Sequence, residues 1–231
     1  MKLGFFTDSH YSSQEITCGK RYNSRSLEKI KEAYSFFEQE KCDLIICLGD
    51  ITDKEDTKEK ETENLKEIAS VISASHIRTV CVMGNHDAFT FTKHDFFTIL
   101  NGCFETKIET DDKTLLFLDT CYFSNGTHYS PGDSNWRDTY LPNAAELRSQ
   151  IKLAASDVYI FMHQNIDPDI SKDHRLSNDS EVRDIIKESG KVKAVFQGHY
   201  HAGKQSNHDG IEYITFPAMC EKDNAFFIKE I

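Results

Sequence analysis

Metal-binding side chains recur in five short segments, each of which follows an apolar run typical of a buried strand. The segments are Asp8-Ser9-His10, Gly49-Asp50-Ile51-Thr52-Asp53, Gly84-Asn85-His86-Asp87, His163 and Gly198-His199-Tyr200-His201. Carboxylate, imidazole and amide groups in this mixture can hold two divalent metals side by side. Such a pair can turn water into a nucleophile and clamp a phosphate. The sequence therefore predicts a two-metal site for phosphorus chemistry.

Strands and helices alternate along the chain and would position these segments. Apolar runs predict strands over residues 2–7, 43–48, 79–83, 114–118, 158–162, 192–196, 204–207, 211–216 and 225–231. Helical spacing of apolar residues predicts helices over Ser26 to Glu40 and within Lys54 to Ser73. Two shorter helices are expected, one with Pro142 in its first turn and one capped by Ser180.

All five segments fall where a predicted strand ends. Strands separated by helices pair largely in parallel, and the ligands of such sheets lie beyond the carboxyl ends of the strands. Residues far apart in the chain can therefore meet at one edge. Gly49, Gly84 and Gly198 directly precede residues of the ligand type. A glycine there suits a sharp turn out of the strand or a close approach of two backbones.

The bulk composition is that of a globular protein. The chain has 231 residues, 39 % hydrophobic and 28 % charged, so we expect one α/β domain over residues 1–231. No apolar run is long enough for a membrane span, and Leu3 to Phe6 is too short for a signal peptide. Seven cysteines without a C-x-x-C pair fit reduced thiols and a cytoplasmic location. Nothing in the sequence predicts an oligomeric state.

The net charge of −11 bears on the partners of the chain. It disfavours tight binding to nucleic acid or to an anionic membrane. It does not disfavour a small phosphorylated substrate, because two bound dications would reverse the local field.

Taken in order, the segments D-x-H, G-D-x-x-D, G-N-H-D, H and G-H-x-H resemble the calcineurin-like metallophosphoesterase superfamily, from Asp8 to His201. Each motif alone is a weak signal, but five in this order, each after a predicted strand, form a specific pattern. The resemblance implies a four-layer α/β sandwich, in which two mixed β-sheets are flanked by α-helices. This expectation replaces the single sheet that the alternation of strands and helices suggests.

The resemblance also implies two metal sites that share Asp50. The ligands would be Asp8, His10, Asp50 and His201 for one metal, and Asp50, Asn85, His163 and His199 for the other. A water between the metals is the expected nucleophile, attacking phosphorus in line. Asp, Asn and His donors suit manganese, iron or zinc, so the predicted cofactor is two divalent ions of these metals.

His86 and Asp87 are the predicted catalytic residues. His86 is not a ligand in the family pattern, and it would stabilise the phosphoryl oxygens or protonate the leaving oxygen. Asp87 is predicted to accept a hydrogen bond from His86 and raise its pKa. Asp53 has two interpretations, as a carboxylate behind the ligands or as the cap of the charged helix that follows. Taken singly, an aspartate after a strand is usually a turn residue and a histidine there is usually a satisfied core residue.

Residues 21–27 and 174–178 look similar to the manganese-dependent ADP-ribose/CDP-alcohol diphosphatase branch of the superfamily. Arg21 or Arg25 could pair with a second phosphate, and His174 and Asn178 could contact a ribose or a base. The alternative is that both arginines lie on the exposed start of a helix and that Asn178 caps the next helix.

The region between Asp119 and Pro142 does not match that branch clearly, so the sequence leaves the leaving-group pocket open. Four aromatic residues cluster there and could stack on a base: Tyr122, Tyr129, Trp136 and Tyr140. We favour the alternative that the loop is packed by its own aromatic side chains.

The expected function is that of a metal-dependent phosphohydrolase acting on a small phosphodiester or a nucleotide pyrophosphate. The first alternative is a phosphomonoesterase that resembles the protein Ser/Thr phosphatases. The second is a non-catalytic scaffold of the same fold, which the presence of His86 and all the expected ligands disfavours.

Overall fold

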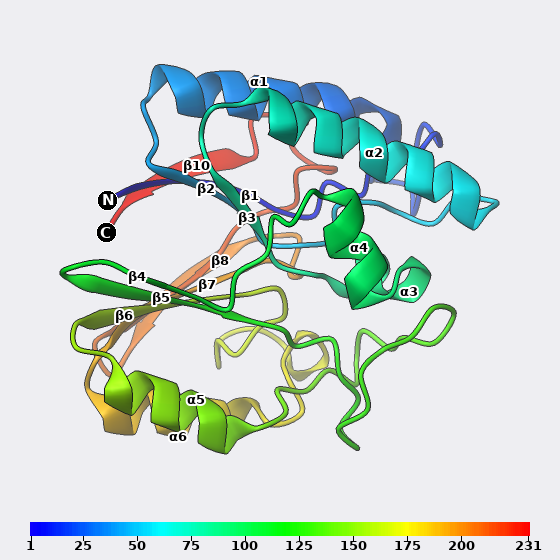
Figure 1. Cartoon of the computed structure of the whole chain (residues 1–231). Coiled ribbons are helices and arrows are strands. Elements are labelled where there is room, and N and C mark those ends of the chain that lie inside the picture. The colour runs from blue at the N-terminus through cyan, green and yellow to red at the C-terminus, as the bar shows by residue number, and fades with distance from the viewer.

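Two β-sheets pack face to face at the centre of the molecule, and helices cover the outer face of each sheet (Figure 1). The computed structural model describes residues 1–231. The two ends of the chain lie side by side, and the terminal amine of Met1 donates to the backbone oxygen of Ile231 over 3.0 Å. The layers therefore follow the order helix, sheet, sheet, helix, which confirms the predicted four-layer sandwich.

The first sheet has the strand order β10-β1-β2-β3. Its strands are β1 (Lys2–Phe6), β2 (Leu44–Cys47), β3 (Thr79–Cys81) and β10 (Phe226–Glu230). β1, β2 and β3 pair in parallel, whereas β10 pairs with β1 in the antiparallel direction. The carboxyl ends of three strands therefore meet at one edge of this sheet.

The second sheet has the strand order β4-β5-β6-β7-β9-β8. Its strands are β4 (Lys107–Glu109), β5 (Lys113–Leu118), β6 (Asp157–Met162), β7 (Val192–Gln197), β8 (Lys204–His208) and β9 (Ile211–Thr215). The four central strands are parallel, and β4 and β8 add antiparallel edges. Both sheets are thus mixed, as the resemblance implied.

Four helices cover the outer faces of the sheets. α1 (Ser26–Gln39) and α2 (Lys58–Ala74) lie on the first sheet, and α5 (Ala144–Leu153) and α6 (Asp179–Ser189) lie on the second (Figure 1). Two short helices that the sequence did not predict, α3 (Asn85–Thr90) and α4 (Lys93–Ile99), follow β3. The 3-10 turns η1 (Asn23–Arg25) and η2 (Lys172–His174) complete the helical segments.

The alternation of side chains along the strands divides the core into three layers. In β1, Leu3 and Phe5 face the second sheet, and the ring of Phe5 stacks on that of Phe196 with centroids 4.9 Å apart. The next residue, Phe6, belongs to the layer beneath α1 and α2. A third layer joins the second sheet to α5 and α6. The central strands β1, β2, β6 and β7 are apolar on both faces because both faces are covered, whereas the edge strands β4 and β8 are polar and largely exposed.

Three predicted helix starts differ from the structure. The charged segment after Lys54 becomes helical only at Lys58, because the side chain of Thr57 caps this helix by accepting from the backbone N–H of Lys60. Pro142 precedes α5 instead of lying in its first turn, and α6 begins at Asp179 instead of after Ser180. None of the helices is both long and apolar enough to cross a membrane.

Candidate metal centre

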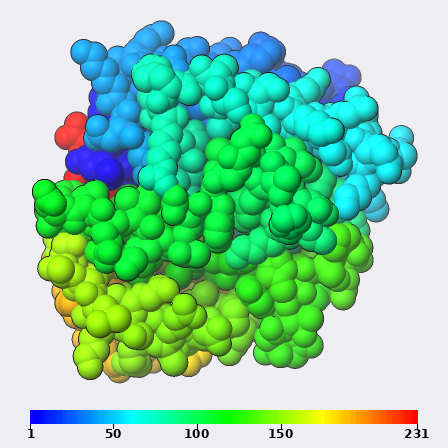
Figure 2. All heavy atoms as spheres, viewed as in Figure 1, coloured from blue at the N-terminus to red at the C-terminus, as the bar shows by residue number.

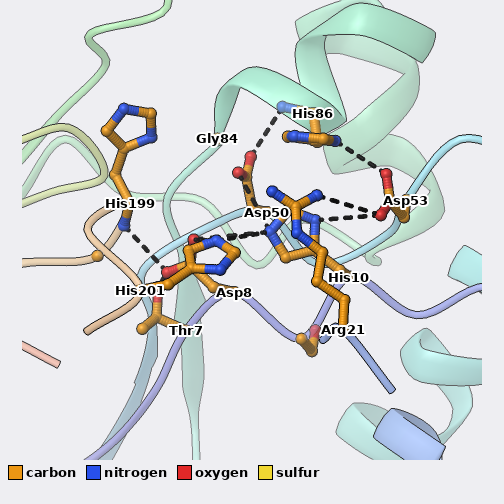
Figure 3. A network of polar contacts seen from close by, with 12 residues as sticks. Thr7, Asp8, His10, Arg21, Asp50, Asp53, Gly84, His86, His199 and His201 are labelled. Atoms are coloured by element: carbon orange, nitrogen blue, oxygen red, sulfur yellow. Dashed lines mark hydrogen bonds and ion pairs between the residues drawn. The ribbon is translucent and has the colours of Figure 1, made fainter. Parts of the chain in front are cut away.

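The carboxyl ends of five strands, three from one sheet and two from the other, converge at one edge of the sandwich. The segment after β1 carries Asp8 and His10, the segment after β2 carries Asp50, and the segment after β3 carries Asn85. The second sheet contributes His163 after β6 and the pair His199 and His201 after β7. Figure 3 shows Asp8, His10 and His201 gathered around Asp50, with the ring of His199 farther to one side.

The backbone leaves the strands in a conformation that non-glycine residues seldom adopt. The φ angles are positive at four candidate ligands: 50° at Asp8, 45° at His10, 51° at Asp50 and 64° at His199. Such residues are uncommon and cost of order 1–3 kcal/mol each, and they concentrate at functional sites. The strain therefore indicates that function, and not local propensity, determines these turns.

Glycines allow the strand ends to approach one another closely. A Cβ atom on Gly84 would lie 2.2 Å from Oδ1 of Asp50, and one on Gly198 would lie 2.8 Å from Oδ2 of Asp8. A Cβ on Gly49 would lie 2.9 Å from Nδ1 of His163. The close approach expected from the sequence is confirmed at all three positions.

One group of candidate ligands surrounds the tips of His10 and His201. Their Nε2 atoms lie 3.2 Å apart. Oδ1 of Asp8 is 3.7 Å from the Nε2 atom of His10 and 3.3 Å from that of His201, and Oδ2 of Asp50 is 3.6 Å from Nε2 of His10. The Nε2 atoms of two imidazole rings and an oxygen atom of each of two carboxylates therefore surround a common point.

A second group lies on the other side of Asp50. Nε2 of His163 is 3.2 Å from Oδ2 of Asp50, the same oxygen that faces His10. One ligand atom each of Asp50, His163 and His199 lie within 4.8 Å of one another. Asn85, buried at the start of α3, adds an amide oxygen. Asp50 therefore belongs to both groups.

Buried atoms without hydrogen-bond partners test whether these residues fit metal ions. Oδ1 of Asp8, Oδ1 of Asn85 and Nε2 of both His163 and His199 are buried and have no partner. A buried polar group left unsatisfied costs about 1–3 kcal/mol. All four atoms can donate a lone pair, so two cations would satisfy them together. The residues present fit a pair of divalent metals.

Further hydrogen bonds fix the orientation of the candidate ligands. Oδ2 of Asp8 accepts from the hydroxyl of Thr7 and from the backbone N–H of His199 (Figure 3). Nδ1 of His163 lies 2.7 Å from the backbone oxygen of Leu48, and Nδ1 of His201 lies 2.6 Å from Oε1 of Glu221. A proton on Nδ1 leaves Nε2 free to coordinate, which is the arrangement that metal-binding histidines favour. No pattern in the sequence pointed to Glu221.

The protonation of the rings depends on their neighbours. Burial, together with repulsion by His86, lowers the pKa of His10 to about 4. Burial, together with repulsion by His163, lowers the pKa of His199 to about 3. At His163 burial acts in the same direction but the carboxylates of Asp50 and Asp8 outweigh it, so the pKa rises to about 10. The field that holds a proton on His163 would also attract a cation.

His86 does not pair with Asp87, and the prediction of that contact is wrong. Nδ1 of His86 lies 2.9 Å from Oδ1 of Asp53 instead (Figure 3). The backbone N–H of His86 donates to Oδ1 of Asp50 over 2.8 Å. Burial lowers the pKa of His86, but the charges of Asp50 and Asp53 outweigh burial and raise it. Of the two interpretations of Asp53, the carboxylate behind the site is therefore correct, and Thr57 caps the helix.

Asp87 instead holds the turn that carries Asp50. Its carboxylate accepts from the backbone N–H groups of Gly84, Asp50, Ile51 and Thr52, at 2.8 to 3.3 Å. The side chain is fully buried, and its hydrogen bonds go to these backbone groups and not to His86. Its position next to His86 in the sequence suggested a catalytic pair, but α3 directs the two side chains to different partners.

The four predicted substrate contacts divide into two kinds. Arg21 lies near the site, with Nη1 3.4 Å from Oδ2 of Asp53, and His174 has its ring 5.4 Å from that of His199. Arg25 is 58 % exposed at the start of α1 and faces Asp223, so it does not join the site. Asn178 bonds both backbone groups of Leu141 at the start of α6 and also lies apart from the site.

Two neighbouring hollows open above the ligands. One has a volume of about 500 Å³ and reaches Asp53 and Phe89, and the other has about 480 Å³ and reaches His199 and His201. Both are lined by Cys18, Arg21, Asn85, His86 and Trp136. The candidate metal site therefore has open space on both sides of His86.

Comparison with known proteins places the chain among enzymes of phosphate esters. A family model described as calcineurin-like phosphoesterase matches residues 1–203. A relative from Fibrobacter succinogenes, described as a probable cyclic nucleotide phosphodiesterase, is 24 % identical over an alignment of 221 residues that covers 87 % of this chain and 73 % of that protein. The resemblance predicted from the five segments is confirmed by the family match.

Solved structures share the fold at low sequence identity. A dimetal phosphatase from Danio rerio has a TM-score of 0.83 at 16 % identity, covering 95 % of this chain and 88 % of that one. GAP50 of Plasmodium, described as the anchor in the inner membrane complex, has a TM-score of 0.65 at 12 % identity, covering 95 % and 72 %. Since an anchor protein has this fold too, the fold alone does not decide the function, and the site must.

Proposed function

We infer the function from the family: the chain belongs to the calcineurin-like phosphoesterases, and we propose that it hydrolyses a small phosphodiester or a nucleotide pyrophosphate. It is a metal-dependent phosphoesterase by family. The finer proposal rests on one observation above all: seven candidate ligands from both sheets converge around Asp50, and four of their atoms are buried without partners.

We assign the ligands as the sequence suggested. Asp8, His10, Asp50 and His201 would hold one metal, and Asp50, Asn85, His163 and His199 the other. When bound, two dications would lower the pKa of a coordinated water and neutralise charge on the phosphoryl oxygens. Manganese, iron and zinc all suit this donor set. The carboxylate of Asp50 is suited to bridging because the same oxygen faces ligands of both groups.

The residues around the ligands divide the remaining work. His86, with Nδ1 facing Asp53, presents its other ring nitrogen to a substrate and can protonate the leaving oxygen. Asp53 keeps that ring oriented and favours its protonated form. Arg21 borders both hollows and can pair with a second phosphate group. Asp87 has no part in these roles, because its carboxylate bonds only backbone groups.

A diester or pyrophosphate is preferred to a monoester because of the space around His86. A phosphorus atom over the ligands would have a hollow on each side, one for each substituent. A phosphomonoester has only one substituent and would leave one hollow to water. The description of the Fibrobacter succinogenes relative as a cyclic nucleotide phosphodiesterase agrees with this preference.

The test is a substrate panel with purified, metal-stripped protein. Manganese, iron and zinc are added in turn, and hydrolysis is measured for a bis-aryl phosphate, an aryl phosphate, a nucleotide pyrophosphate and a phosphopeptide. We expect metal-dependent turnover that is faster with the diester or pyrophosphate. Faster turnover of the aryl phosphate or phosphopeptide would favour the phosphomonoesterase. Turnover at background with every metal would favour the non-catalytic scaffold.

A further inference from the structure

Trp136 has a different environment from the other aromatic residues of its segment. Tyr129 is buried and packs edge-on against Phe123, with ring centroids 4.6 Å apart. Tyr122 packs edge-on against His128, at 4.6 Å. Packing of the loop by its own aromatic side chains thus accounts for these rings. Trp136 is only half-buried and is the one aromatic ring of the segment that borders both hollows.

The indole lies directly beside the candidate metal site. Its centroid is 6.1 Å from that of His199, a candidate ligand, and 5.1 Å from that of His174. The guanidinium of Arg137 lies 4.3 Å from the indole centroid and is held only by a long contact with Asp173. The guanidinium therefore packs on one face of the indole in a cation–π contact.

The turn that carries Trp136 is held in place before any substrate arrives. The hydroxyl of Tyr129 lies 2.7 Å from the backbone oxygen of Asn135 and 2.8 Å from that of Asp138, so it can donate to either. The backbone N–H of Asp138 also donates to the oxygen of Asn135. A ring fixed in this way loses little conformational entropy when a ligand stacks on it.

Contacts with neighbouring elements fix the segment over the site. The backbone N–H of Gly132 donates to the oxygen of Phe89 in α3, and that of Ser177 donates to the oxygen of Thr139. In Figure 2 the atoms of this segment form a continuous surface with those of α3 and α4. The segment therefore spans from the helix that follows β3 to the start of α6.

We propose that Trp136, held by Tyr129, is the residue that selects substrates carrying a nucleobase, by stacking on the base while the phosphoryl group lies over Asp50. This inference rests on the proposed function and specifies its substrate class. Stacking accepts any base because every base has a π-face, so the selection is for a planar aromatic substituent and not for one base. Aliphatic phosphodiesters would lack this contact.

The chain offers a direct probe, because Trp136 is its only tryptophan. AMP and ribose 5-phosphate differ only in the base, and each is titrated against the full chain at constant metal concentration while indole fluorescence is followed. We expect AMP to quench the fluorescence and ribose 5-phosphate to leave it nearly unchanged. Equal responses to both ligands would overturn the proposal.

Variants measure the contribution of stacking by calorimetry. Trp136→Ala should weaken the affinity for AMP roughly 5- to 150-fold, the range for loss of one stacked base, and leave the affinity for ribose 5-phosphate unchanged. Trp136→Phe should restore part of the difference. Tyr129→Phe, which keeps the ring but loses the hydroxyl, should weaken the affinity for AMP by less than Trp136→Ala does. An unchanged affinity for AMP in Trp136→Ala would contradict the proposal.

Tyr122→Ala is the matched control, since it removes an aromatic ring of the same segment that borders neither hollow. If Tyr122→Ala weakened the affinity for AMP as much as Trp136→Ala does, the loss would come from a loosened loop and the proposal would fail. The ratio of the affinities for AMP and ribose 5-phosphate does not depend on turnover. Absence of hydrolysis with every metal would reject the proposed function alone. Equal affinities for AMP and ribose 5-phosphate would reject the stacking role alone.

Discussion

Nδ1 of His86 lies 2.9 Å from Oδ1 of Asp53, on the segment after β2, and this contact joins the candidate acid to the turn that carries Asp50 (Figure 3). Asp53 is further held by Asn23, whose amide donates to Oδ2 over 3.0 Å and also to the backbone oxygen of His10. One asparagine thus ties together the segments that follow β1 and β2.

Asp53→Asn should move the pH profile of the enzyme. The charge of Asp53 favours the protonated ring of His86, so its removal should lower the pKa of His86. If protonated His86 donates to the leaving oxygen, the alkaline limb of kcat/KM moves to lower pH. The metal content should stay unchanged, and steady-state kinetics across the neutral and alkaline range provides the measurement. An alkaline limb that does not move would show that Asp53 does not set the pKa of the general acid.

His86→Ala should keep the metals and lose turnover. A missing general acid costs roughly 10²- to 10⁴-fold in kcat. Substrates with a good leaving group, such as a nitrophenolate, should be affected less because they need no proton. Metal content by elemental analysis and kcat for two leaving groups check this. Loss of metal with an unchanged rate would show that His86 is a ligand instead.

Asp87→Ala should destabilise the protein without acting through His86. The substitution leaves up to four buried backbone N–H groups without an acceptor, and each unsatisfied group costs about 1–3 kcal/mol. Denaturant unfolding should therefore occur at a clearly lower midpoint. Asp184→Ala on the exposed surface of α6 is a suitable control and should change the midpoint little. A stable Asp87→Ala with a shifted pH profile would restore the pairing that the sequence suggested.

The difference between Asp53 and Asp87 illustrates which parts of the molecule could be predicted from the sequence. Strands and the main helices follow from apolar runs and periodicity, because burial of those side chains is a local pattern. The partner of His86 is decided by the direction in which α3 projects its side chains, and no local pattern encodes that direction. The two short helices after β3 were missed because six and seven residues are too few to show helical periodicity.

The ligand segments were predictable because each follows an apolar strand and a glycine marks three of the turns. Glu221 and Asn23 were not, since they support the site from a turn before β10 and from η1, and neither lies in a motif. The organisation as a single domain stays a prediction, and so do the cytoplasmic location and the individual ligand roles.

Affinity for Mn²⁺ should rise with pH. In the metal-free protein the proton on His163, with a folded pKa of about 10 against an ordinary 6.5, stabilises the fold fully below 6.5, and this contribution is lost as the pH rises through 10. A metal ion must displace that proton, so raising the pH favours binding. Calorimetry in buffers of different ionisation enthalpy should detect proton release on binding. Affinity independent of pH, without proton release, would exclude His163 as a ligand.

The proposed two-metal centre is tested by locating the metal ions in crystals of the protein grown with Mn²⁺, using anomalous scattering. We expect two peaks on either side of Asp50, one beside Asp8, His10 and His201 and the other beside Asn85, His163 and His199. A single peak, or peaks only at the separate cluster of Asp167, Asp169 and His208, would contradict the two-metal centre.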